Sequence, residues 1–217
     1  MKTLTLILIT GVLSMGLFAK ENKEEIFWKW FEKNEMKIFQ FENDQETILD
    51  SISEHLNLYH ESLVFEISQE TNGKREIIIS ADGIEELFPS VESLVKETPS
   101  LNRWSVIAFR PRMENYSDFG LTYSGKEFDP KKLWIYYRVE NGFFDLIIYF
   151  PDYIEDQRDT YVNAAYVLLD MALGEYDVVK SIRYIDFQKS PVNPKENGLQ
   201  PFSELRSVFD KYKNSKD

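Results

Sequence analysis

The chain has 217 residues, no cysteine and a formal net charge of −12, with 37 acidic against 25 basic side chains. The lack of cysteine excludes disulfides and thiolate-held zinc. The acidic balance argues against nucleic acid and anionic membranes as partners, because basic surfaces bind both. Aromatic residues make up 15% of the chain and fall within periodic segments, so we expect a folded protein rather than a disordered one.

The first residues have the pattern of a secretory signal peptide. Lys2 is followed by an uncharged run from Leu4 to Ala19, after which charged residues resume. A positive start, an apolar centre and a small residue at the cut are typical of such signals, although Leu17 stands where a small residue is favoured. We therefore expect residues 1–19 to be a signal peptide and the protein to be periplasmic or secreted. The alternative is a retained anchor, for which the run is slightly short of the roughly 17 to 25 residues that span a bilayer.

Two helices are predicted at the start of the mature chain. Over residues 24–39 and again over residues 45–59, apolar side chains recur at helical spacing between charged ones. Asn43 precedes Glu46 by three positions, which predicts a capping box at the start of the second helix. The aromatic side chains of the first helix are expected to form a buried face rather than a ligand platform.

An Asn-Gly pair at residues 72–73 predicts the first β-hairpin, because both central residues of a type I′ turn need positive φ. A two-residue turn there sets Ile67 opposite Ile78 and Glu70 opposite Arg75. The two apolar residues would then pack against each other, and the two opposite charges would lie side by side.

A helical segment is expected over residues 84–95, with an interruption at Pro89. A short apolar strand follows over residues 104–109. It should end at the next proline, which cannot donate a ladder hydrogen bond and which separates Arg110 from Arg112.

The clearest hairpin joins residues 133–140 to residues 143–150 through a second Asn-Gly pair. Its register sets Arg138 opposite Asp145. The same register gathers six apolar side chains on one face, which we predict to be core: Ile135, Tyr137, Val139, Phe144, Leu146 and Ile148.

The last part of the chain predicts a helix over residues 155–173 ended at Gly174, a strand over residues 176–187 and a helix over residues 203–212. Hairpins make antiparallel pairs. We therefore expect an α+β fold, a single domain over residues 20–217, with a mostly antiparallel sheet and helices packed mainly on one face.

The side chains offer little for metal or nucleophilic chemistry. His55 and His60 are the two histidines of the chain, and their spacing places them on different sides of a helix. No nucleophile motif of the G-x-S-x-G type accompanies them. We therefore assign no catalytic residue and expect no metal and no cofactor.

Arg110 and Arg112 are the best candidates for a binding surface, because two guanidinium groups at one sheet edge can hold a carboxylate or phosphate. The alternative is that they neutralise internal acids such as Glu66 or Asp82. Convergence of Glu66, Asp82 or Glu175 with Arg110 in one pocket would instead favour a carboxylate-dependent hydrolase.

Several sequence blocks resemble a family of bacterial proteins that has no assigned activity. The likeness runs from Phe27 to Phe209, so it implies the extent of the domain and lends no catalytic residue. Many family members are associated with the cytoplasm, and the leader of this chain is a departure from them. The blocks are FWKWF, ISADG, FPSVESLV, RWSVIAFRPR and LLDMALGEYDV.

The leading hypothesis is an exported, non-enzymatic binding or interaction module with a protein or small-molecule partner. It follows from the export signal, the scarcity of catalytic side chains and the aromatic, partly open sheet. One alternative is the carboxylate-dependent hydrolase. The other is an acidic, toxin-neutralising (immunity-like) protein, which would bind a basic partner in a salt-sensitive way.

Overall fold

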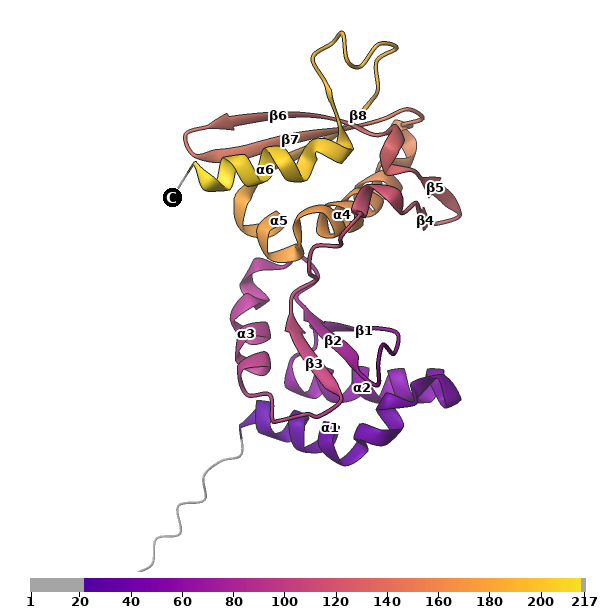
Figure 1. Ribbon diagram of the computed structural model, residues 1–217, viewed down its shortest axis with the longest axis vertical. Helices are drawn as coiled ribbons and strands as arrows, with labels where there is room; N and C mark the ends of the chain where they lie inside the picture. Colours follow the sequence, from indigo (N-terminus) through magenta and orange to yellow (C-terminus); the bar gives the residue numbers. More distant parts are fainter. Residues whose placement is uncertain (1–21, 216–217) are drawn as a thin grey trace, which may run out of the picture.

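The computed structural model of the protein describes residues 22–215, which form two stacked lobes (Figure 1). Residues 22–109 make the N-terminal lobe and residues 110–215 the C-terminal lobe, and the chain passes between them after β3 (Trp104–Ala108). The expected α+β class is confirmed. In the described range, antiparallel strand pairings outnumber parallel ones by four to two.

The predicted signal peptide, residues 1–19, lies outside the described residues. Between residues 22 and 215 no helix combines the length and the apolar character that a bilayer crossing needs.

The N-terminal lobe packs three helices against a three-stranded sheet of order β1-β2-β3. Its buried side chains form one hydrophobic cluster that includes Ile77 and Ile79 of the central strand. The elements are α1 (Lys23–Phe39), α2 (Gln45–Tyr59), β1 (Val64–Ile67), β2 (Arg75–Ser80), α3 (Phe88–Lys96) and β3.

Helix α1 buries its aromatic face, as predicted. Phe27, Trp28 and Phe31 are each almost fully buried, and the indole N–H of Trp28 donates to the backbone oxygen of Leu94 at 2.8 Å. The Asn22 side chain accepts the backbone N–H of Glu25 at 2.7 Å and so caps the helix. These aromatic residues belong to the core of the lobe.

The predicted register of the first hairpin is wrong by one residue. The turn at 72–73 forms, but Ile67 pairs with Ile77 instead of Ile78. The Ser68 hydroxyl accepts the backbone N–H of Glu76 at 2.8 Å, in place of a carbonyl oxygen. Between this point and the turn, the first strand therefore has one residue more than the second, as in a β-bulge.

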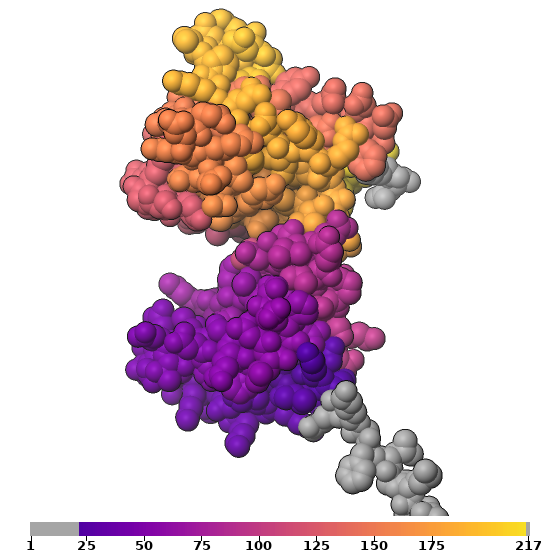
Figure 2. Space-filling model, turned by 180° about the vertical axis from the view of Figure 1, so that it is seen from behind, coloured from indigo at the N-terminus to yellow at the C-terminus, as the bar shows by residue number. Residues whose placement is uncertain are grey.

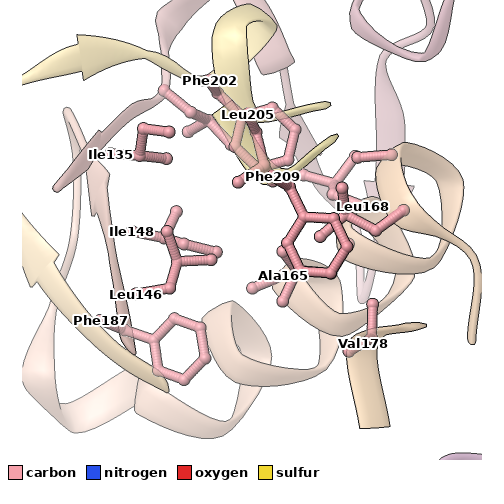
Figure 3. Close-up of a cluster of buried hydrophobic side chains, with 14 of the residues drawn as sticks. Ile135, Leu146, Ile148, Ala165, Leu168, Val178, Phe187, Phe202, Leu205 and Phe209 are labelled. Carbon is pink, nitrogen blue, oxygen red and sulfur yellow. The ribbon is translucent and has the colours of Figure 1, made fainter. Parts of the chain in front are cut away.

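The C-terminal lobe has a four-stranded sheet of order β8-β7-β6-β9 and a separate two-stranded ribbon. Helices α4 and α6 pack on one face of the sheet, and Figure 3 shows the aliphatic and phenyl side chains that fill the space between them. The elements are β4 (Leu121–Tyr123), β5 (Lys126–Phe128), β6 (Trp134–Glu140), β7 (Phe143–Phe150), α4 (Arg158–Leu173), α5 (Glu175–Ser181), β8 (Ile182–Lys189), β9 (Gln200–Pro201) and α6 (Leu205–Asn214).

The register of the second hairpin is confirmed, with Arg138 opposite Asp145. Of its predicted core face, four side chains are fully buried: Ile135, Phe144, Leu146 and Ile148. Tyr137 is half-buried and Val139 is exposed, so the predicted core face is buried along only part of its length.

Other predicted details differ from the structure. Asp44, without a side-chain cap, precedes α2, so the predicted capping box is absent. Pro89 stands in the first turn of α3, where a missing N–H costs nothing, and does not interrupt it. The predicted strand over residues 176–187 begins instead as helix α5 and becomes β8, parallel to β7.

Candidate functional site

Arg110 lies two residues after the end of β3, at the point where the chain enters the C-terminal lobe. Its Nε lies 2.5 Å from Glu66 and its Nη2 lies 3.0 Å from Asp82, both in the N-terminal lobe. Its Nη1 lies 3.5 Å from Asp170 of α4. The guanidinium therefore links the lobes. It is neutralised by the protein's own acids, which was the alternative to a role in binding an external anion.

Glu175, at the start of α5, joins this cluster through backbone groups. It is fully buried, and its carboxylate accepts N–H groups of Ala81 at 3.0 Å, Gly83 at 3.2 Å and Arg110 at 3.0 Å. All three donors are main-chain groups at the lobe boundary. A buried carboxylate held in this way stabilises the fold and has little freedom to react.

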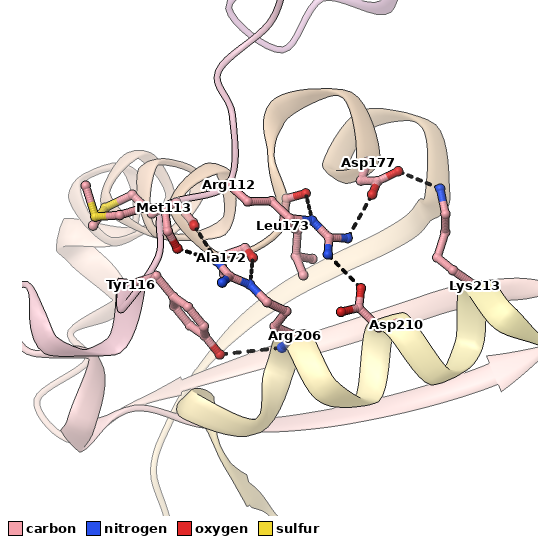
Figure 4. A network of polar contacts seen from close by, with 10 residues as sticks. Arg112, Met113, Tyr116, Ala172, Leu173, Asp177, Arg206, Asp210 and Lys213 are labelled. Atoms are coloured by element: carbon pink, nitrogen blue, oxygen red, sulfur yellow. Dashed lines mark hydrogen bonds and ion pairs between the residues drawn. The ribbon is translucent and has the colours of Figure 1, made fainter. Parts of the chain in front are cut away.

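Arg112 does not join Arg110. Its guanidinium donates to the Leu173 carbonyl oxygen at 2.8 Å, to Asp177 at 2.9 Å and to Asp210 at 2.7 Å (Figure 4). Leu173 ends α4, so this arginine satisfies a helix-terminal carbonyl. The predicted paired grip of Arg110 and Arg112 on one anion is therefore not formed.

Asp170 is a member of the cluster that the sequence did not single out. It lies on the predicted long helix as one acid within the apolar stretch from Leu168 to Leu173. An acid isolated among apolar residues was the sequence feature that could have indicated its role. The side chain is 14% exposed, and burial is the main reason that its pKa is raised to about 7. Glu175 and Asp82 add to the rise, while Arg110 opposes it.

The ion-pair partners of Arg110 stabilise the protonated form of its guanidinium. Burial alone would lower its pKa, but the ion pairs with Glu66, Asp82 and Asp170 outweigh that effect and the pKa rises. Three carboxylates therefore surround the guanidinium, and a fourth, that of Glu175, binds the backbone N–H of the same residue. The pKa of Asp170, about 7, lies close to neutral pH.

A cleft of about 860 Å³ opens beside this cluster, between the lobes. Figure 2 shows the outline of the molecule narrowing at the same level. Glu66, Asp82 and Ile78 line it from the N-terminal lobe. The opposite wall is largely apolar and comes from α4, α5 and β8: Tyr166, Val167, Met171, Val178, Val179, Ile182 and Ile185.

Neither histidine lines this cleft. His55 stacks on Trp30 with ring centroids 3.9 Å apart, and its Nδ1 lies 2.8 Å from the Ser51 carbonyl oxygen. His60 follows the end of α2. Across residues 22–215, no three histidine or acidic side chains are placed to hold a metal ion.

Comparison of the chain with protein-family models, with curated proteins and with solved structures found no significant match. The family resemblance seen in the sequence blocks therefore stays a prediction, and the cleft is interpreted from its own residues.

Proposed function

We propose that the protein is an exported, non-enzymatic binding module whose small ligand enters the cleft between the lobes. The observation that carries this proposal is the cleft itself, lined by both lobes and about 860 Å³ in volume. Sites for small molecules have volumes of roughly 300–1,000 Å³. A ligand touching both walls would add contacts between the lobes to those that Arg110 and Glu175 already make.

The lining favours a ligand with a positively charged group and an apolar body. Glu66, Asp82 and Asp170 outnumber the guanidinium of Arg110 beside them. Arg112 also lines the cleft, but its charge is matched by Asp177 and Asp210, so this end of the cleft attracts cations. The apolar wall of α4 and β8 would then cover the rest of the ligand.

A steric variant tests the cleft. Val167 lines it and Val192 is an exposed loop residue, so Val167→Trp fills the cleft while Val192→Trp makes the same change elsewhere. We expect arylalkylamines to raise the melting temperature of the wild type and of Val192→Trp, and to leave that of Val167→Trp unchanged. The matching arylalkyl alcohols should have less effect. Equal ligand shifts in both variants would contradict the proposal.

Export is tested separately. Expression of the full chain in a Gram-negative host, followed by fractionation, should place the protein outside the cytoplasm with Lys20 as its first residue. A cytoplasmic protein that keeps its leader would overturn this part, and a membrane-bound one would support the anchor alternative.

One observation favours the hydrolase as a second candidate. Asp170, with a pKa raised to about 7, shares a guanidinium with Glu66 and Asp82, and an acid of that pKa can donate and accept protons near neutrality. Nitrophenyl glycosides and nitrophenyl phosphate are suitable substrates. Turnover that is lost in Asp170→Asn would support this candidate, and the absence of turnover across pH 5–9 would remove it.

A further inference from the structure

The sheet of the C-terminal lobe has a second face that no helix of residues 22–215 covers. In Figure 1, α4, α5 and α6 lie on one side of β6, β7 and β8, and only the loop after β8 rises on the other. The side chains of this open face alternate with the buried ones along each strand. We call it the aromatic face, and it consists of Trp134, Tyr136, Phe143, Ile147, Tyr149 and Tyr184 together with the polar residues between them.

The aromatic face is exposed to solvent to a degree unusual for rings. Tyr136 is 46% exposed, Phe143 49% and Tyr184 53%, whereas Ile135, Leu146 and Ile148 on the opposite face are fully buried. Pairing places Trp134 beside Tyr149 and Tyr136 beside Ile147 on neighbouring strands. Large apolar patches that stay exposed mark interaction sites more often than not.

The charges on this face cancel. At the turn end, Asp145 lies 2.9 Å from Arg183 Nε and 3.2 Å from Arg138, which also lies 3.2 Å from Glu140. At the other end Asp186 lies 3.3 Å from Arg158, which comes from the start of α4. Two arginines thus meet two acids at one end, and one meets one at the other.

This balance stands out on a chain of net charge −12. A charged partner would have to break ion pairs that are already made, at a cost in desolvation. An uncharged partner would not. Like net charges also oppose the close approach of a second copy of the chain.

The face also offers free hydrogen-bonding groups beside its rings. Within the described range, the hydroxyls of Tyr136, Tyr149 and Tyr184 have no hydrogen-bond partner in the protein, so each can donate and accept. Gln188, next to Tyr149 in the ladder, donates its amide nitrogen to Asp186 at 3.1 Å and adds an amide oxygen that can accept. Flat rings bordered by hydroxyl and amide groups suit a ligand with apolar faces and many hydroxyls.

We propose that the aromatic face binds a neutral polysaccharide or oligosaccharide. The C–H faces of the sugar rings would stack on the tyrosine, tryptophan and phenylalanine side chains, and the sugar hydroxyls would bond to the tyrosine hydroxyls and Gln188. This site is separate from the inter-lobe cleft, so its test does not depend on the ligand proposed for the cleft.

Calorimetry and tryptophan fluorescence with cellohexaose, laminarihexaose, maltohexaose and chitohexaose test the proposal. We expect at least one of these to bind the wild type and to bind the Tyr136→Ala/Tyr184→Ala double variant at least tenfold more weakly. Phe143→Ala should weaken binding as well. Phe119→Ala is the matched control, because Phe119 is 52% exposed but precedes β4, outside this sheet. Since the ligand is neutral, the affinity should not change with salt.

Four outcomes would overturn the proposal. They are the absence of binding by all four oligosaccharides at millimolar concentration, unchanged binding in the double variant, equal loss in Phe119→Ala, and binding confined to anionic polysaccharides with a steep salt dependence. Dimerisation that the double variant abolishes, without sugar binding, would assign the face to a second copy instead. Circular dichroism of each variant shows whether the sheet is intact.

Discussion

Glu175 and Arg110 hydrogen-bond to each other through two reciprocal contacts. The backbone N–H of Arg110 donates to the Glu175 carboxylate at 3.0 Å, and the backbone N–H of Glu175 donates to the Arg110 carbonyl oxygen at 2.9 Å. Both lie where the chain passes from one lobe to the other. The same carboxylate also binds two N–H groups of the turn after β2, so one buried side chain fixes the lobes against each other.

Replacing Glu175 by glutamine should therefore destabilise the protein. The amide can accept hydrogen bonds through one atom only, so at least one of the N–H groups of Ala81, Gly83 and Arg110 would lose its acceptor in a buried place. We expect a loss of about 2–3 kcal/mol in the free energy of unfolding, measured with urea. Glu70→Gln, at an exposed position, should change it by less than about 0.5 kcal/mol. Equal stability of the two variants would show that the carboxylate is not needed there.

Gly174, the residue before Glu175, cannot be replaced without strain. Its φ of 81° and ψ of 143° belong to a region that is essentially restricted to glycine, and an added Cβ would lie 3.4 Å from the Arg110 carbonyl oxygen. Gly174→Ala should cost about 1–3 kcal/mol in unfolding free energy. Gly198 also has positive φ but has open space around it, so Gly198→Ala should cost only about 1 kcal/mol. A smaller loss at Gly174 than at Gly198 would contradict this assignment.

The elements predicted best from the sequence were those that local patterns determine. The hairpin of β6 and β7 formed with its predicted register, because Asn141 and Gly142 both adopt the positive φ of its turn. Helix α5 was predicted as a strand. Its β-branched pair Val178 and Val179 favours strands locally, but Val178 packs into the core of the C-terminal lobe and Val179 against that of the other lobe, and tertiary packing overrides propensity.

The candidate site was predicted only in part, because it too depends on tertiary packing. The convergence of Glu66, Asp82 and Glu175 with Arg110, which the sequence analysis named as the feature that would favour a hydrolase, is present. Arg112 lies two residues from Arg110 but bonds to α4, α5 and α6 instead. Neighbours in sequence diverge here because the chain is crossing between lobes, and the contact partners of a crossing segment depend on long-range packing that periodicity does not encode.

Arg75 provides a test of the register shift in the first hairpin. It is buried and donates to the carbonyl oxygens of Phe39 and Ser68, each at 2.9 Å, and to Glu42 at 2.6 Å, rather than facing Glu70 as predicted. Lysine keeps the charge, but its single ammonium group lacks the planar set of N–H donors that reaches these three acceptors.

We therefore expect Arg75→Lys to lower the free energy of unfolding by about 2–3 kcal/mol, as measured with urea. Arg138→Lys is the matched control, since Arg138 is exposed and its ion pairs should be worth less than about 1 kcal/mol. A near-neutral Arg75→Lys would mean that Arg75 is not held in the way described.

Asp170 should make the protein less stable as the pH rises. Its pKa is about 7 in the folded protein and about 3.9 in an unfolded chain. Between these values the folded state holds a proton that unfolding releases, so stability falls with increasing pH through this window, and the whole penalty is present above pH 7. Asp170→Asn removes the titration and leaves Arg110 paired with Glu66 and Asp82.

Urea unfolding at pH 5 and pH 8 measures the effect. The wild type should lose roughly 2–4 kcal/mol more than Asp170→Asn between the two pH values, and the variant should be the more stable protein at pH 8. Asp156→Asn, at an exposed position, should keep the pH dependence of the wild type. If Asp170→Asn also kept it, the carboxyl group of Asp170 would be ionised at an ordinary pKa, and the proton-exchanging role that supports the hydrolase candidate would fall with it.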